Sequence, residues 1–132
     1  MTCFWDGIIS SLDKDDLKLL GLTERTKPAE LAIKLKQLNR KTNEVYWETN
    51  LLRLNEIEEN FIHVRDFAHQ SVYGGYLCSI CDPFLCLLAQ LLKVNIDHTY
   101  LNHTVHYSIK NSRKTLYYKS DRGHFWKNIN CG

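Results

Sequence analysis

Asp82-Pro83-Phe84-Leu85-Cys86-Leu87-Leu88-Ala89-Gln90-Leu91-Leu92 is the stretch that decides the fold of this 132-residue chain, together with Val94-Asn95-Ile96 just after it. An acidic residue followed by proline is a typical helix start, so we expect a helix to begin at Pro83. The residues after Pro83 are almost all apolar, and a helix that is apolar on every side is buried. From Val94 the apolar residues recur at every second position, as they do in strands. A buried helix that leads into strands predicts an α+β protein.

The sequence after this helix predicts a small sheet. Its strands are expected at Val94–Ile96, Thr104–Ile109, Thr115–Tyr118 and His124–Trp126, which are rich in β-branched and aromatic residues. Asn111-Ser112 is the predicted hairpin turn between the second and the third strand, which makes the sheet a mostly antiparallel meander. Three strand and turn histidines are expected to face solvent: His98, His103 and His106.

The first two thirds of the chain are predicted to be helical. The expected helices are Cys3–Leu12 with Thr2 as N-cap, a second from Asp13 that Gly21 closes, a third from Pro28 with Leu31, Leu35 and Leu38 as its buried stripe, and a long one from about Glu44 to about Phe67. Ser71–Cys81 is expected to be a loop, because Gly74-Gly75 interrupts the helical pattern. We expect these helices to pack on the C-terminal sheet in one domain over residues 1–132.

The charge balance argues against a nucleic-acid partner. The chain has 17 basic and 15 acidic residues, a formal net charge of +2. Nucleic-acid-binding domains usually carry a strongly basic face, which this composition does not predict. No apolar run approaches the roughly 20 residues of a membrane span, and the start lacks the basic-then-apolar pattern of a secretory signal. The sequence therefore predicts a cytoplasmic protein without membrane contact.

The five cysteines are expected to be reduced, because no secretory signal precedes them. They are Cys3, Cys78, Cys81, Cys86 and Cys131. Cys78 and Cys81 have the C-x-x-C spacing of a zinc knuckle, and Cys86 with His98 or His103 would complete four ligands. A second closely spaced ligand pair is missing, however, and Cys86 lies inside an apolar helix. We therefore expect no metal site.

Two short segments at opposite ends of the chain carry the candidate chemistry. Thr2-Cys3-Phe4-Trp5-Asp6-Gly7-Ile8-Ile9 places a cysteine at the start of an apolar helix, and Gly123-His124-Phe125-Trp126 places a histidine on an aromatic strand. A helix N-terminus and a nearby imidazole both favour the reactive thiolate over the thiol. A cysteine early and a histidine late in a chain suggest a papain-like hydrolase. The alternative is that Cys3 is a small buried apolar residue and that His124 is satisfied by a backbone partner.

The order of three motifs resembles that of the ovarian tumour (OTU) family of papain-like deubiquitinating cysteine proteases. Cys3-Phe4-Trp5-Asp6-Gly7-Ile8 follows the order of the family's nucleophile motif, in which a large apolar residue and an aromatic follow the cysteine. Tyr73-Gly74-Gly75 resembles the family's Trp-Gly-Gly loop, which leads into an acid-capped helix and then a strand containing isoleucine. His124-Phe125 resembles the family's catalytic histidine with its following aromatic. The compact length is similar to that of viral members.

The resemblance implies a papain-like fold of OTU type and a deubiquitinase that hydrolyses the isopeptide bond after the C-terminal glycine of ubiquitin. Cys3 would be the nucleophile and His124 the general base. Tyr73, Gly74, Gly75 and Trp126 would contact the substrate, the glycines by keeping the cleft narrow. No cofactor would be needed. The expected partner is ubiquitin, polyubiquitin or a related modifier, bound by a monomer in the host cytoplasm or in a virion.

The chain departs from the family pattern in two places. Only Met1 and Thr2 precede Cys3, where the family has an Asp-Gly-Asn-like loop that donates N–H groups to the oxyanion. Trp126 stands two residues after the histidine, where the family usually has the Asp or Asn that orients the imidazole. Asp121 and Asn128 are the candidate substitutes, with Asn130 also nearby. These departures keep two alternatives open: a non-catalytic OTU-like binding module or virion protein, and a cysteine protease that processes a viral polyprotein.

Overall fold

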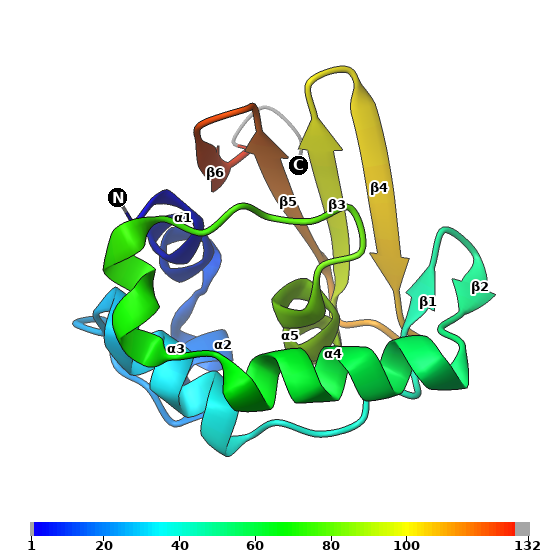
Figure 1. Cartoon of the computed structure of the whole chain (residues 1–132), viewed down its shortest axis with the longest axis horizontal. Coiled ribbons are helices and arrows are strands. Elements are labelled where there is room, and N and C mark those ends of the chain that lie inside the picture. The colour runs from blue at the N-terminus through cyan, green and yellow to red at the C-terminus, as the bar shows by residue number, and fades with distance from the viewer. Residues whose placement is uncertain (1, 129–132) are drawn as a thin grey trace.

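The computed structural model describes residues 2–128, which form a mixed helix and strand protein with one six-stranded sheet (Figure 1). The elements are α1 (Cys3–Ser11), α2 (Lys14–Leu20), α3 (Pro28–Gln37), β1 (Tyr46–Trp47), β2 (Asn50–Leu51), α4 (Leu54–Asp66), the 3₁₀ helix η1 (His69–Gly74), α5 (Pro83–Leu92), β3 (Asn95–Tyr100), β4 (His103–Ser108), β5 (Thr115–Ser120) and β6 (Phe125–Lys127). The strand order is β2-β1-β4-β3-β5-β6, and only β3 and β5 pair in parallel. The prediction of a mostly antiparallel sheet is confirmed.

The sheet buries one face and exposes the other. The buried side chains alternate along the strands: Ile96 and His98 on β3, Val105 and Tyr107 on β4, Leu116, Tyr118 and Ser120 on β5, and Phe125 on β6. The opposite face carries polar contacts such as the ion pair between Asp97 and His106. A mostly antiparallel sheet can expose one face to solvent because its other face packs against helices.

The helix α5 occupies the centre of the molecule, between strands β3 and β4 and the helix α4 (Figure 1). All its residues except Leu91 are buried. Asp82 caps the helix by accepting hydrogen bonds from the N–H groups of Phe84 and Leu85, at 2.9 and 3.3 Å. The predicted start at Pro83 and the predicted burial are both confirmed.

The first three helices also begin where the sequence predicts. Asp13 and Asp16 form a reciprocal capping box at the start of α2, and Gly21 closes the helix in the left-handed conformation with φ of 72°. Leu31 and Leu35 are fully buried on α3. Thr2 holds the N-cap position of α1, but its side chain makes no capping hydrogen bond within the described chain and contacts the carboxylate of Asp6 instead.

The predicted long helix over 44–67 is wrong over its first ten residues, 44–53. Residues 46–51 form the hairpin β1–β2, and α4 begins only at Leu54. Glu48 and Thr49 at the tip have positive φ values of 54° and 97°, which a right-handed helix does not tolerate. Tyr46 pairs with Ser108 of β4, so pairing with the sheet overrides the helical spacing of the apolar residues here.

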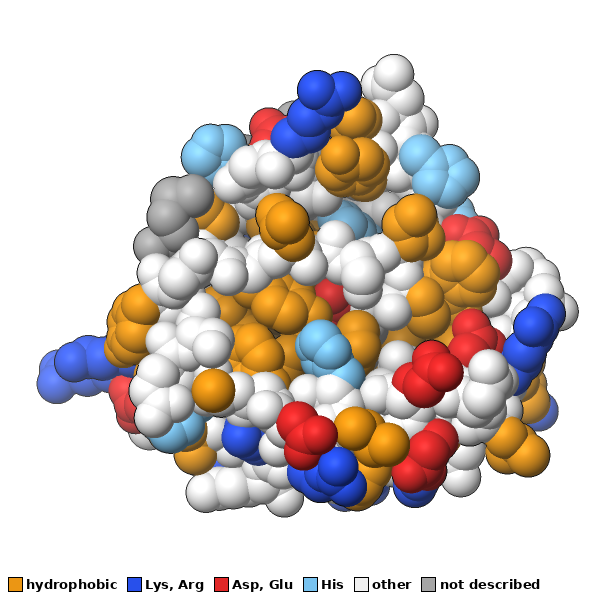
Figure 2. Space-filling view, viewed as in Figure 1, with side chains coloured by type: hydrophobic (Ala, Val, Ile, Leu, Met, Phe, Trp, Pro, Cys, Tyr) orange, Lys and Arg blue, Asp and Glu red, His pale blue; other side chains and the backbone are white. Residues whose placement is uncertain are grey.

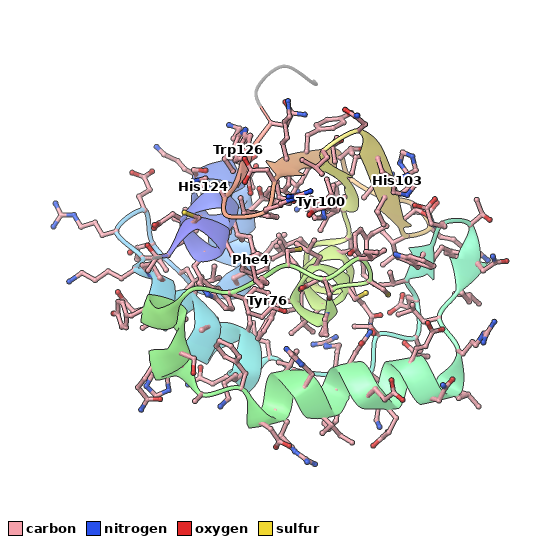
Figure 3. All side chains as sticks on the ribbon, turned by 45° about the horizontal axis from the view of Figure 1, so that its top comes forward. Phe4, Tyr76, Tyr100, His103, His124 and Trp126 are labelled. Carbon is pink, nitrogen blue, oxygen red and sulfur yellow. The ribbon has the colours of Figure 1, made fainter. Side chains whose placement is uncertain are left out.

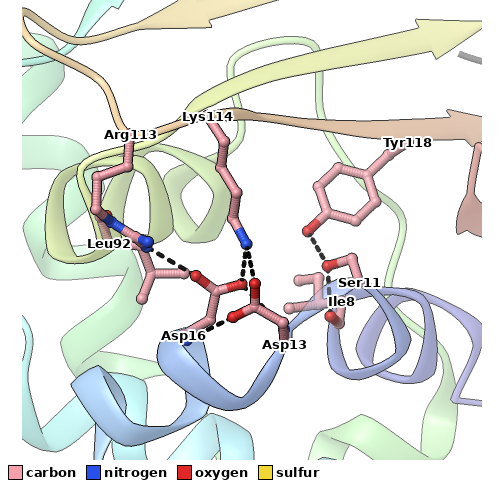
Figure 4. A network of polar contacts seen from close by, with 8 residues as sticks. All are labelled: Ile8, Ser11, Asp13, Asp16, Leu92, Arg113, Lys114 and Tyr118. Atoms are coloured by element: carbon pink, nitrogen blue, oxygen red, sulfur yellow. Dashed lines mark hydrogen bonds and ion pairs between the residues drawn. The ribbon is translucent and has the colours of Figure 1, made fainter. Parts of the chain in front are cut away.

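The predicted meander is also wrong, because β4 and β5 are not neighbours. β3 lies between them, so the segment around Asn111-Ser112 is a crossover below the start of β3 and not a hairpin turn. This crossover is anchored on α2 (Figure 4). The fully buried carboxylate of Asp16 accepts hydrogen bonds from Arg113 at 2.7 Å and from Lys114 at 2.6 Å.

The segment predicted as a loop over 71–81 begins as part of η1 and continues without regular structure over residues 75–81, which we call the pocket loop. The buried carboxylate of Asp82 ties this loop to α5. It accepts hydrogen bonds from the Tyr76 hydroxyl at 2.8 Å and from the Ser79 N–H at 3.0 Å. Burial raises the pKa of this carboxyl, while these hydrogen bonds oppose the rise. Among the described helices, none combines the length and apolarity needed to cross a bilayer.

Candidate active site

Cys3 and His124 come together although 121 positions separate them in the sequence. The Cys3 Sγ lies 3.7 Å from the His124 Nδ1. Cys3 is the first residue of α1, so its thiol is at the end of the helix where the N–H groups lack intrahelical acceptors. His124 directly precedes β6 and its side chain is exposed. Thiol–imidazole pairs in free enzymes are often longer than a working hydrogen bond, and this distance fits such a pair.

The packing of α1 on β6 sets this distance. Phe4 and Phe125, the residues that follow Cys3 and His124, have ring centroids 4.8 Å apart. Gly7 lets the helix approach closely, because a Cβ at this position would lie 2.8 Å from the Phe125 ring and 3.3 Å from the Trp126 Cα. A side chain on Gly7 would therefore push α1 away from the strand that follows His124.

Phe125 is fixed from the sheet side as well. Its ring stacks on the fully buried Tyr118 with centroids 5.1 Å apart. The Tyr118 hydroxyl shares a hydrogen bond of 2.6 Å with the Ser11 Oγ at the end of α1 (Figure 4). The backbone next to His124 is therefore held by both α1 and β5.

Asp121, a candidate to orient the imidazole, hydrogen-bonds the backbone of the turn that carries His124. Its Oδ1 accepts from the N–H groups of Gly123 and His124, both at 2.9 Å. These bonds, that of Gly123 foremost, lower the pKa of the Asp121 carboxyl. The second candidate, Asn128, follows β6, and its N–H donates to the Tyr117 carbonyl at 2.9 Å. Asn130 lies outside the described residues.

A pocket of about 770 Å³ opens beside the Cys3–His124 pair. One wall consists of Gly74 and the pocket loop from Gly75 to Ile80. The other wall consists of residues 120–125 with the adjoining ends of β3 and β4. Figure 3 places His124, Tyr100 and His103 along the strand ends, with Tyr76 and Phe4 below them. Two predicted substrate contacts, Tyr73 and Trp126, are 60% and 39% exposed and lie outside the set of described residues that line the pocket.

The two glycines of the pocket wall differ in their backbone requirements. Gly75 has φ of 90° and ψ of 144°, a conformation that side-chain-bearing residues rarely adopt. A Cβ on Gly74 would meet no described atom within 4 Å. Gly75 is therefore required by the chain path, whereas the absence of a side chain at Gly74 leaves open space at the pocket wall.

The prediction that His98 faces solvent is wrong, because His98 is only 2% exposed and lines the pocket. Its Nε2 lies 2.6 Å from the Ser120 Oγ, and its Nδ1 lies 3.8 Å from the Cys78 Sγ. Burial lowers the pKa of His98 to about 4, and it raises the pKa of the Cys78 thiol. Burial therefore opposes the proton transfer from Cys78 to His98 that would create a thiolate, which makes Cys78 a weaker candidate nucleophile than Cys3. His103 and His106 are exposed, as predicted.

The C-x-x-C segment assembles no ligand set among residues 2–128. No group of three or more His, Cys, Asp or Glu residues in this part of the chain is arranged to hold a metal ion. Cys78 faces His98 instead, and Cys86 is buried in α5.

Comparison with known proteins identifies no relative of this chain. No protein-family model, no curated protein and no solved structure matches the chain.

Proposed function

We propose that this protein is a papain-like cysteine hydrolase of OTU type that cleaves isopeptide bonds at the C-terminus of ubiquitin. The observation that carries the proposal is the distance of 3.7 Å between the Cys3 Sγ and the His124 Nδ1, at the mouth of a pocket with two glycines in its wall. The motif order of the sequence supports the choice of family.

The proposed reaction uses the thiol and the imidazole in turn. His124 takes the Cys3 proton, and the thiolate attacks the carbonyl carbon of the C-terminal glycine of ubiquitin. His124 then protonates the lysine nitrogen as the isopeptide C–N bond breaks, which leaves a thioester on Cys3. A water molecule, deprotonated by His124, hydrolyses the thioester and releases the ubiquitin carboxylate. In this proposal the N–H groups of the first turn of α1, which lack intrahelical acceptors, bind the oxyanion.

The surface around the pocket supports a protein substrate. Hydrophobic side chains gather across the middle of the face drawn in Figure 2. Leu77 and Ile80 of the pocket loop are 81% and 64% exposed, beside a pocket that leads to Cys3. Exposed apolar side chains next to a cleft are typical of surfaces that bind another protein. A glycine at position 74 leaves room for an extended peptide, such as the glycine-ending tail of ubiquitin.

Ubiquitin with a thiol-reactive group in place of its C-terminal carboxylate tests this proposal. We expect a covalent adduct with the parent chain, no adduct with Cys3→Ala, and an unchanged adduct with Cys81→Ala, which removes a partly exposed thiol of the pocket loop. An adduct that survives in Cys3→Ala would contradict the assignment of the nucleophile. A Cys3 that reacts with iodoacetamide but not with the ubiquitin probe would retain the hydrolase and remove ubiquitin as its substrate.

A non-catalytic OTU-like binding module is the second candidate function. One observation favours it: the Asp121 carboxylate binds two backbone N–H groups of its own turn, which leaves the role of imidazole orienter to another group. A binding module would retain ubiquitin reversibly in Cys3→Ala and in the parent alike, and would form no adduct with the probe.

A further inference from the structure

We propose that His98 is a positioning residue for His124, because it ties the turn that carries His124 to the pocket loop on the opposite wall. The inference rests on the proposed function, in which His124 is the general base. No hydrogen bond or ring contact joins His98 to Cys3 or to His124 among the described residues, so its effect passes through Ser120, Phe125 and Cys78.

The first connection is to the stem of the His124 turn. Ser120 is the last residue of β5 and is 5% exposed. Its Oγ shares a hydrogen bond of 2.6 Å with the His98 Nε2. Ser120 pairs with Phe125 across β5 and β6, so these two residues flank the turn that contains His124. Fixing the Ser120 side chain therefore fixes one end of a turn only four residues long.

The second connection is to the residue after His124. The His98 and Phe125 rings pack with centroids 5.4 Å apart. Phe4 and Tyr118 contact the same Phe125 ring from α1 and β5. His98 thus supplies a third contact to the side chain that anchors His124 against the start of α1.

The third connection is to the pocket loop. The His98 Nδ1 lies 3.8 Å from the Cys78 Sγ, in the middle of this loop. Asp82 anchors the loop at its C-terminal end. Because β3 is a central strand, His98 offers both pocket walls a rigid point of attachment.

A neutral imidazole suits this link because it both donates and accepts. Neutral histidine carries one N–H donor and one acceptor nitrogen, so it can bond Ser120 with one nitrogen and the Cys78 thiol with the other. Glutamine places its amide nitrogen near the position of Nε2, and asparagine places its amide near that of Nδ1. His98→Gln therefore keeps a partner for Ser120 and loses the contact with Cys78, whereas His98→Asn keeps a partner for Cys78 and loses the contact with Ser120.

The pH dependence of Cys3 alkylation tests the proposal without a ubiquitin substrate. Iodoacetamide reacts with the thiolate, so a thiol that gives its proton to a neighbouring base keeps more of its reactivity at about pH 6, relative to about pH 9, than an isolated thiol does. We would measure the ratio of the two rates at Cys3 by peptide mapping. His124→Ala defines the ratio without the base. His106→Ala, on the solvent-exposed face of the same sheet, is the matched histidine control.

We expect His98→Ala and His98→Asn to lower this ratio by at least about threefold, toward the value of His124→Ala, and His98→Gln to restore most of it. Ser120→Ala removes the same hydrogen bond from the other side and should lower the ratio as well, which decides the question if His98→Ala fails to fold. An unchanged ratio in Ser120→Ala and in the folded His98 variants would overturn the inference alone. A parent ratio equal to that of His124→Ala would instead overturn the proposed function.

Discussion

Phe4 and Phe125 pack with their ring centroids 4.8 Å apart, and each directly follows one member of the Cys3–His124 pair. The packing of these two rings therefore fixes the backbone beside both members of the pair. Side chains on packed elements hold their geometry better than side chains on loops, which is the requirement for a nucleophile and its base.

Gly7→Ala tests the close approach that this packing needs. The added Cβ would lie 2.8 Å from the Phe125 ring, so α1 must shift away from β6 and Cys3 from His124. We expect the free energy of unfolding to fall by about 1–3 kcal/mol and the rate of ubiquitin-probe labelling to fall by about tenfold or more. Ser10→Ala, which changes an exposed side chain of the same helix, is the control. Equal labelling by the two variants would show that the helix–strand contact does not set the site.

Features of the site and the fold that depend on local sequence could be predicted, whereas features that depend on strand pairing could not. The start of α5 and the positions of Cys3 and His124 follow from local signals: a capping acid, a proline and short motifs near the two ends. The hairpin at 46–51 did not follow, because its apolar residues also fit helical spacing and only pairing with β4 decides between the two. The position of β5 beside β3 could not be predicted either, because the alternation of apolar residues indicates which segments are strands but not which strands are neighbours.

His98 could have been found, because its signal was present in the sequence. Ile96 and His98 are two positions apart on β3, so they lie on the same face, and Ile96 is fully buried there. The same alternation places Ser120 on the inner face with Leu116 and Tyr118. Residue type alone favours a solvent-facing histidine, whereas this period of two places His98 on the buried face.

His98 should make the stability of the fold depend on pH. Its pKa is about 4 in the folded protein and near 6.5 in the unfolded chain, so the unfolded state binds the extra proton between these values. Stability therefore falls as the pH drops through this window, by about 2 kcal/mol between pH 7 and pH 5. The neighbouring Cys78 thiol does not titrate there, since burial raises its pKa. Urea unfolding at both pH values should give a clearly smaller difference for His98→Gln than for the parent; identical differences would contradict this account.

Gly74→Val and Gly75→Ala should separate the substrate role of the pocket wall from its folding role. A side chain on Gly74 projects into open space, so we expect unchanged stability and labelling by the ubiquitin probe reduced about tenfold. Gly75 has φ of 90°, so Gly75→Ala should lower the free energy of unfolding by about 1–3 kcal/mol. Rates of reaction with iodoacetamide provide the control, because this small reagent should reach Cys3 in Gly74→Val as it does in the parent. Full labelling of Gly74→Val would show that the substrate does not pass this wall.

Asp16→Asn tests the network that anchors the crossover between β4 and β5. The buried Asp16 carboxylate binds Arg113 and Lys114, and removing its charge leaves two cations without their buried partner. We expect a loss of about 3 kcal/mol in the free energy of unfolding, measured by urea denaturation. Asp15→Asn, which changes an exposed acid of the same helical turn, should have an effect within about 0.5 kcal/mol. Similar losses in the two variants would argue against the network as an anchor.

Asp121 should act through the shape of its turn rather than through its charge. Its Oδ1 accepts two backbone hydrogen bonds, and an asparagine oxygen accepts the same two bonds without a negative charge. We therefore expect Asp121→Asn to label with the ubiquitin probe at a rate within about twofold of the parent, and Asp121→Ala to label about tenfold more slowly. If the carboxylate instead stabilised an imidazolium at His124, the asparagine variant would be as slow as the alanine variant. The comparison of the two rates therefore decides whether Asp121 holds the backbone before His124 or is the third member of a catalytic triad.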